Sequence, residues 1–123
     1  MSTTALTATN FADTVEEHDI ILIDFWAEWC GPCKTFGPIY EKAAERHDDV
    51  VFGKVDTESE QALAAQFGIM SIPTLMAIRE KVVVFSQPGV VPEDAIDSLI
   101  EQVRALDMDE VRSSIEEEAQ QDG

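Results

Sequence analysis

The chain is poor in cysteine and in basic residues. Of its 123 residues only Cys30 and Cys33 carry a thiol, and 8 lysines and arginines stand against 25 aspartates and glutamates, for a net charge of −17. This shortage of positive charge argues against binding nucleic acid or anionic lipid, because both are polyanions. It favours solubility and partners whose contact surfaces are basic.

Long apolar runs are also missing. The longest, IILI before Asp24, has the length of a strand, whereas a membrane span needs roughly 20 apolar residues. No basic leader followed by an apolar core and a small-residue cleavage site opens the chain. We therefore expect a cytoplasmic protein. In that compartment stable disulfides are rare, and a cysteine pair is usually reactive or metal-bound.

The remaining composition is that of a globular domain, with 45% hydrophobic residues and a length that suits one core. The end of the chain differs, because residues 107–123 hold seven acidic residues and a single arginine. We expect one domain at residues 1–106 and an acidic C-terminal extension at 107–123, partly helical or disordered. Helix should fray near residues 116–118, where the helix dipole disfavours negative charge, and residues 119–123 should be mobile.

Apolar spacing predicts alternating strands and helices. Residues 20–26 are nearly continuously apolar, as in a parallel strand covered on both faces, and Thr57 with Glu60 forms a possible capping box. The predicted elements are a helix at 10–17, a strand at 20–26, a helix at 32–47, a strand at 50–56, a helix at 57–68, paired strands at 74–79 and 81–86, and a helix at 92–106. This order predicts an α/β sandwich.

Both cysteines lie in the segment DFWAEWCGPCK, between a predicted strand and a predicted helix. A Cys30 thiol there faces unpaired backbone N–H groups and the positive end of the helix dipole, which lower its pKa. Cys33 follows one helical turn later on the same side, close enough to form a disulfide. Gly31 lets the backbone approach closely, and Pro32 begins a helix without losing a bonded N–H.

Three interpretations of the pair are open: a structural disulfide, a metal site and a redox centre. A disulfide across so short a loop stabilises by only roughly 2 kcal/mol. A zinc site usually needs four ligands, but there is no second cysteine pair, and His18 and His47 lie far away in sequence. A Cys-x-x-Cys in a strand–helix–strand context favours a redox centre without a metal.

DFWAEWCGPCK, the downstream SIPT and the Pro-Gly pair before the last helix resemble the thioredoxin family over residues 5–106. The resemblance implies a thioredoxin fold, with a central mixed β-sheet flanked by helices on both faces. It implies a protein-disulfide reductase in which Cys30 is the exposed nucleophile and Cys33 resolves the mixed disulfide. It also implies a monomer without a bound cofactor, whose dithiol an NADPH-dependent, flavin-containing thioredoxin reductase restores.

The resemblance assigns roles to further residues. By itself, Asp24 would be an acid at a strand end facing water, but the family places it buried behind the cysteines as proton acceptor for the second thiol, with Lys54 as the matching lysine. Pro73 would be cis, whereas sequence alone favours trans. The implied docking surface for clients comprises Trp29, Gly31, Pro32, Ile72, Pro73, Thr74, Gly89 and Val90.

Other expectations concern the surroundings of the site. Trp26 should pack in the core beneath it, and the two histidines should be solvated. The hairpin turn, REK, lacks the Asn-Gly pair common in this fold. A second hypothesis is a thioredoxin-like chaperone or partner-binding module, and a third is an oxidant or isomerase of disulfides. The complete cysteine motif with Gly-Pro at its centre favours the reductase.

Overall fold

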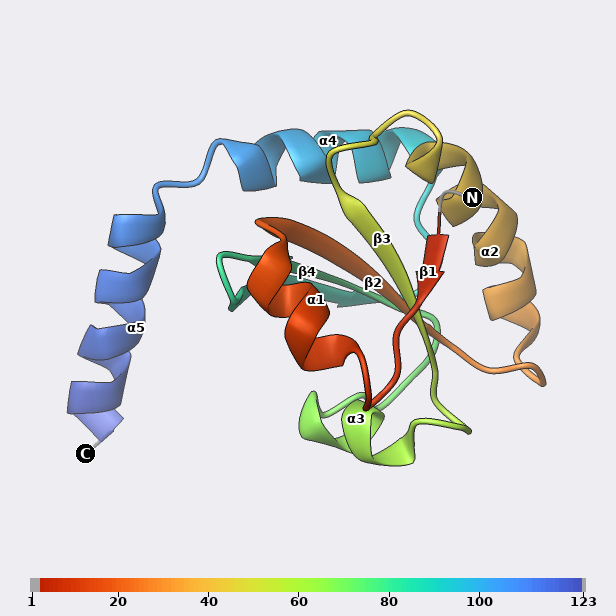
Figure 1. The fold of residues 1–123 in the computed structure, drawn as a ribbon, viewed down its shortest axis with the longest axis horizontal. Helices are drawn as coiled ribbons and strands as arrows, with labels where there is room; N and C mark the ends of the chain where they lie inside the picture. The colour runs from red at the N-terminus through yellow and green to blue at the C-terminus, as the bar shows by residue number, and fades with distance from the viewer. Residues whose placement is uncertain (1–2, 123) are drawn as a thin grey trace.

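A computed structural model describes residues 3–122. Its centre is a five-stranded sheet in the order β1-β3-β2-β4-β5 (Figure 1), in which β1, β3 and β2 run parallel while β4 and β5 are antiparallel to their neighbours. The elements are β1 (Thr3–Ala5), α1 (Phe11–Glu17), β2 (Ile20–Trp26), α2 (Gly31–Ala44), β3 (Val51–Asp56), α3 (Gln61–Gln66), β4 (Thr74–Arg79), β5 (Val82–Pro88), α4 (Glu93–Arg104) and α5 (Met108–Asp122). The predicted mixed sheet with helices on both faces is confirmed.

Alternation along β2 divides the core into two layers. Ile20 and Leu22 pack with α2 and α4 on one face of the sheet. Ile21, Ile23 and Phe25 pack with α1 and α3 on the other. Because side chains alternate along a strand, Asp24 belongs to the face that α2 covers. The buried strand predicted from continuous apolar residues is thus correct, and it carries its one acid towards α2.

Three details of the secondary structure differ from the sequence prediction: a helix cap, an additional strand and the end of a helix. The predicted capping box is wrong, because the Thr57 hydroxyl donates to the Trp26 carbonyl oxygen (3.1 Å) and the Glu60 carboxylate accepts from the Ala8 amide (2.8 Å). Strand β1 was not expected; it pairs with the edge of β3. The helix predicted to end at residue 47 ends at Ala44.

Both histidines were predicted to be solvated. The prediction is confirmed for His18, which is solvent-exposed, and is wrong for His47. The His47 ring is half-buried, stacks on Phe52, and its Nε2 lies 2.7 Å from Asp97 Oδ1.

The β4–β5 hairpin turns through two residues with positive φ, Glu80 (48°) and Lys81 (71°). Arg79 pairs with Val82 across the turn. Positive φ at both central residues is the signature of a type I′ turn, which suits the twist of the flanking strands. The hairpin therefore adopts the usual turn without the usual Asn-Gly pair, and β5 begins at Val82.

The C-terminal extension is one helix, α5, which lies on the far side of the sheet from the beginning of α2 (Figure 1). Met108 is buried against the body, and Arg112 donates to Glu80 at 2.8 Å. Arg79 donates to the carbonyl oxygens of Val103 and Leu106, where α4 gives way to α5. The expected fraying at residues 116–118 is wrong, since α5 continues to Asp122; residue 123 of the segment expected to be mobile lies outside the described residues.

No helix within residues 3–122 is long and apolar enough to cross a membrane.

Candidate active site

Cys30 and Cys33 form a disulfide at the beginning of α2, with their Cα atoms 5.3 Å apart. Cys30 is the N-cap residue, in extended conformation, and its Sγ accepts a hydrogen bond of 3.2 Å from the Cys33 amide. The sulfur of Cys30 therefore occupies the place of an N-cap oxygen. Once the pair is reduced, this amide and the helix dipole favour the thiolate at Cys30.

Both cysteines are covered in this oxidised form. Cys30 is 4% exposed and Cys33 is 5% exposed, packed with Ala27 and with the partly buried Trp26 and Ile72. The expectation of an exposed Cys30 is therefore wrong for the disulfide state. The two cysteines are almost equally covered but differ in position. Cys30 Sγ lies at the helix cap, 3.8 Å from the Ile72 carbonyl oxygen.

Asp24 is fully buried, and neither of its carboxylate oxygens accepts a hydrogen bond. Its register partner on the neighbouring strand is Lys54. Burial raises the pKa of Asp24 to about 7, against an opposing effect of the Lys54 charge and with a smaller upward contribution from Glu41. The predicted burial of Asp24 is confirmed, and at this pKa the carboxyl is able to take up and release protons near neutral pH.

A pocket opens beside Cys33, between α2 and the ends of β2 and β3. Its lining includes Trp26, Cys33, Glu41 and Lys54. Lys54 Nζ lies 5.3 Å from the centre of the Trp26 ring, within range of a cation–π interaction. Trp26 packs against the cysteines as expected, but it is only half-buried, because it also lines the pocket. The pocket gives solvent a route to the side of the site that holds Cys33.

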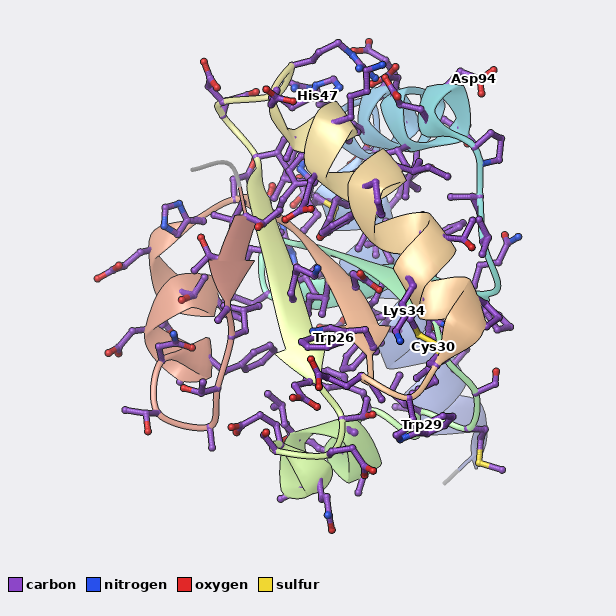
Figure 2. All side chains as sticks on the ribbon, turned by 90° about the vertical axis from the view of Figure 1, so that its right-hand side faces the viewer. Trp26, Trp29, Cys30, Lys34, His47 and Asp94 are labelled. Carbon is purple, nitrogen blue, oxygen red and sulfur yellow. A yellow bond between two sulfur atoms is a disulfide. The ribbon has the colours of Figure 1, made fainter. Side chains whose placement is uncertain are left out.

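The eight residues predicted to contact clients differ in solvent exposure. Trp29 is 69% exposed, with its Nε1 donating to Glu58 Oε1 at 3.0 Å, and Figure 2 shows it at the tip of the loop beside Cys30. Gly31, Pro32, Gly89 and Val90 are also exposed, and Ile72 is half-buried. These six residues are the part of the predicted client surface that solvent reaches, and we call them the docking surface.

Pro73 and Thr74 lie beneath that surface. The Ile72–Pro73 peptide bond is cis, as the resemblance implied, and the Pro73 carbonyl oxygen accepts from the Gly89 amide at 2.8 Å. Both side chains are buried, and the Thr74 hydroxyl donates to the Ser71 carbonyl oxygen at 2.6 Å. Thr74 thus supports the loop from below and does not offer its side chain to a client.

Sequence reasoning missed two residues at the site. Met70 is 95% exposed and borders a groove with Trp29 and Ile72; its place just ahead of the SIPT motif was the available signal. Glu41 lines the pocket beside Cys33 and acts on Asp24. The signal for Glu41 was its spacing, since positions 33, 37 and 41 share one face of a helix.

Comparison with known proteins agrees with this geometry. Residues 2–102 match the family model described as thioredoxin. A curated protein named "Putative thioredoxin 2" from Streptomyces coelicolor is 61% identical over 99% of this chain and 91% of its own length. The thioredoxin of Haemophilus influenzae is 42% identical over 76% of this chain and 89% of its own length.

A mutant thioredoxin from Halobacterium salinarum is similar in structure, with a TM-score of 0.78 at 34% identity, over 86% of this chain and 94% of that one. The family model ends before α5, whereas the match to the Streptomyces protein continues through it.

Proposed function

The chain belongs to the thioredoxin family, and from this membership we propose how its residues divide the work of the reaction. The protein is a thiol-disulfide oxidoreductase that reduces protein disulfides through the reversible Cys30–Cys33 pair. The proposal assigns attack to Cys30, resolution to Cys33, and acceptance of the Cys33 proton to Asp24.

Cys30 attacks first. Its thiolate forms a bond to one sulfur of the client disulfide, the client S–S bond breaks, and the other client sulfur leaves as a thiolate. The support for this assignment is the N-cap position of Cys30, whose Sγ accepts from the Cys33 amide at 3.2 Å. A thiolate at a helix N-terminus is stabilised by the amides and dipole there.

Cys33 then resolves the mixed disulfide. Its thiol gives its proton to the ionised carboxyl of Asp24, and its sulfur attacks Cys30, so that the second client thiolate leaves and the Cys30–Cys33 bond forms. Two electrons have passed from the pair to the client. The pKa of Asp24, raised by burial to about 7, suits this acceptor role, and Lys54 beside it keeps the ionised form accessible near neutral pH.

An extended client segment docks on the apolar surface formed by Trp29, Gly31, Pro32, Ile72, Gly89 and Val90. The closeness of Cys30 Sγ to the Ile72 carbonyl oxygen supports this placement, because a client backbone beside Ile72 brings its disulfide to Cys30. Pro73 and Thr74 hold the loop that carries Ile72.

The family acts on disulfide-containing clients and receives electrons from reductase partners. For this chain we propose the specific case of a monomer in the cytoplasm, reduced by an NADPH-dependent flavin reductase. Residues 1–106 form the domain that carries the chemistry, and residues 107–123 form an extension to it.

The acidity of the Cys30 thiol tests the assignment. The thiolate absorbance of reduced Cys33→Ser, which retains only Cys30, should titrate at lower pH than that of reduced Cys30→Ser. A more acidic Cys33 would contradict the proposed order of attack. NADPH consumption by the wild-type protein, which keeps both cysteines, with insulin and candidate flavin reductases tests the proposed partner.

A further inference from the structure

A groove extends the docking surface towards α3. Its lining includes Trp29, Thr57, Ile69, Met70 and Ile72. Trp29 is held at one side by its hydrogen bond to Glu58, and Ile72 joins the groove to Cys30 Sγ. An extended client segment that passes the disulfide therefore continues along this groove and reaches the side chain of Met70.

Met70 differs from the other methionines that the structure describes. It is 95% exposed, whereas Met76 is 2% exposed in β4 and Met108 is 5% exposed at the beginning of α5. A thioether reacts with a hydroperoxide only where the oxidant reaches the sulfur. When Cys30 and Cys33 are joined in the disulfide, neither offers a free thiol. Among the sulfur atoms of residues 3–122, that of Met70 is then the accessible target.

We propose that Met70 is an oxidation-sensitive contact of the docking surface, at which a hydroperoxide switches client capture down while leaving the disulfide intact. The inference rests on the proposed docking of clients beside Ile72. The thioether sulfur attacks the peroxide, the O–O bond breaks, and one oxygen is transferred to sulfur. Hydrogen peroxide yields water and methionine sulfoxide, with sulfur oxidised and peroxide reduced by two electrons.

The sulfoxide weakens docking because it replaces a flexible apolar side chain by a polar one. Its oxygen requires a hydrogen-bond donor, and an apolar client side chain in the groove offers none, so docking leaves the oxygen desolvated and unpaired. A small disulfide that reaches Cys30 without lying along the groove does not meet this cost. The two kinds of substrate should therefore respond differently.

The experiment treats the oxidised full-length protein with hydrogen peroxide, removes the peroxide, and reduces the disulfide with a dithiol before assay. Peptide mapping by mass spectrometry locates the sulfoxide, which we expect at Met70 well before Met76 or Met108. We expect kcat/KM for insulin reduction to fall roughly three- to tenfold, as for loss of one interface contact. Reduction of a small aromatic disulfide should remain unchanged.

Variants separate the effect from general damage. Met70→Leu keeps an apolar side chain without a sulfur, so its rate of insulin reduction should be the same before and after peroxide treatment. Met70→Gln should reproduce the loss without peroxide, whereas Ile115→Gln, which changes an exposed apolar residue on α5, should not.

Early oxidation of Met76 or Met108, or a Met70 sulfoxide without effect on insulin, would overturn the inference. If Trp29→Ala still impaired insulin reduction in that case, the docking surface itself would stand. If Trp29→Ala and Met70→Gln were both without effect, the proposed docking would fail instead.

Discussion

Asp24 and Lys54 are register partners on the neighbouring parallel strands β2 and β3, yet neither oxygen of the Asp24 carboxyl accepts a hydrogen bond. Attraction to the Lys54 charge favours ionisation, but the loss of hydration on burial outweighs it and raises the pKa of Asp24 to about 7. The protein thus keeps a buried carboxyl with a pKa near neutral pH, and its register partner Lys54 lines the same pocket as Cys33.

Asp24→Asn should stabilise the oxidised protein increasingly as pH rises. The folded pKa of about 7 lies above the ordinary value of 3.8, so the folded state binds more protons between these two values and wild-type stability falls as pH rises through that window. A difference of about three units between the two pKa values corresponds to about 4 kcal/mol in the free energy of unfolding. The asparagine variant has no such titration.

Denaturant unfolding of both proteins from pH 3 to 9 measures the effect. The stability difference should grow from about pH 4, level off above about pH 7, and be absent below pH 4. A difference that does not vary with pH would show that the carboxyl titrates normally in the folded protein.

Lys54→Met and Glu41→Gln should move the pKa of Asp24 in opposite directions. Removing the positive charge of Lys54 raises it, and removing the negative charge of Glu41 lowers it. Tyr40 also interacts with Asp24, but burial holds the pKa of Tyr40 well above its ordinary value, so the phenol remains neutral in this pH range. Carbon NMR of the Asp24 carboxyl measures the midpoint, with Glu45→Gln as a remote control of equal charge change.

The site was predictable from sequence to the extent that local chemistry determines it. The Cys-x-x-Cys spacing after a buried strand places both sulfurs at a helix N-terminus. The burial of Asp24 was predicted only through the resemblance to the thioredoxin family, because the local sequence by itself favours an acid that faces water. The exposure of Met70 and the half-burial of His47 were not predictable in this way. They depend on how α3, α4 and the loops pack, which no local pattern encodes.

Lys81→Gly should stabilise the protein by roughly 1 kcal/mol or less, because Lys81 has a φ of 71° and a Cβ is unfavourable there. The greater freedom of glycine in the unfolded chain offsets part of the gain. Lys81→Ala is the matched control, since it also removes the ion pair with Glu16 but keeps Cβ. Thermal unfolding should rank glycine above alanine; the reverse order would contradict the strained turn.

Met108 should anchor α5 and Ile115 should not. Met108 is 5% exposed and Ile115 is 46% exposed, so Met108→Ala should cost roughly 2 kcal/mol or more and Ile115→Ala about 0.5 kcal/mol or less. Truncation after Leu106 removes Met108 and the Arg112–Glu80 pair, and should destabilise the protein while leaving insulin reduction nearly unchanged. Equal effects of the two alanine variants would contradict the anchor.

The extension illustrates the limit of charge arguments from sequence. The helix dipole disfavours residues 116–118 by about 1 kcal/mol or less per charge, and a helix already begun gains one hydrogen bond with each added residue. The propagation of α5 from its anchor at Met108 therefore outweighs the repulsion. β1 was missed because its three residues show no alternation, and only pairing with β3 makes them a strand.

Attack by Cys30 and resolution by Cys33 are tested most directly by trapping the mixed disulfide that forms between these two steps. Reduced Cys33→Ser is mixed with a disulfide-containing client, quenched with acid, and the cross-linked peptides are identified by mass spectrometry. We expect a stable mixed disulfide through Cys30 in this variant and none through Cys33 in Cys30→Ser. Accumulation of a mixed disulfide through Cys33 in Cys30→Ser, or client release by Cys33→Ser at the wild-type rate, would contradict this assignment of roles.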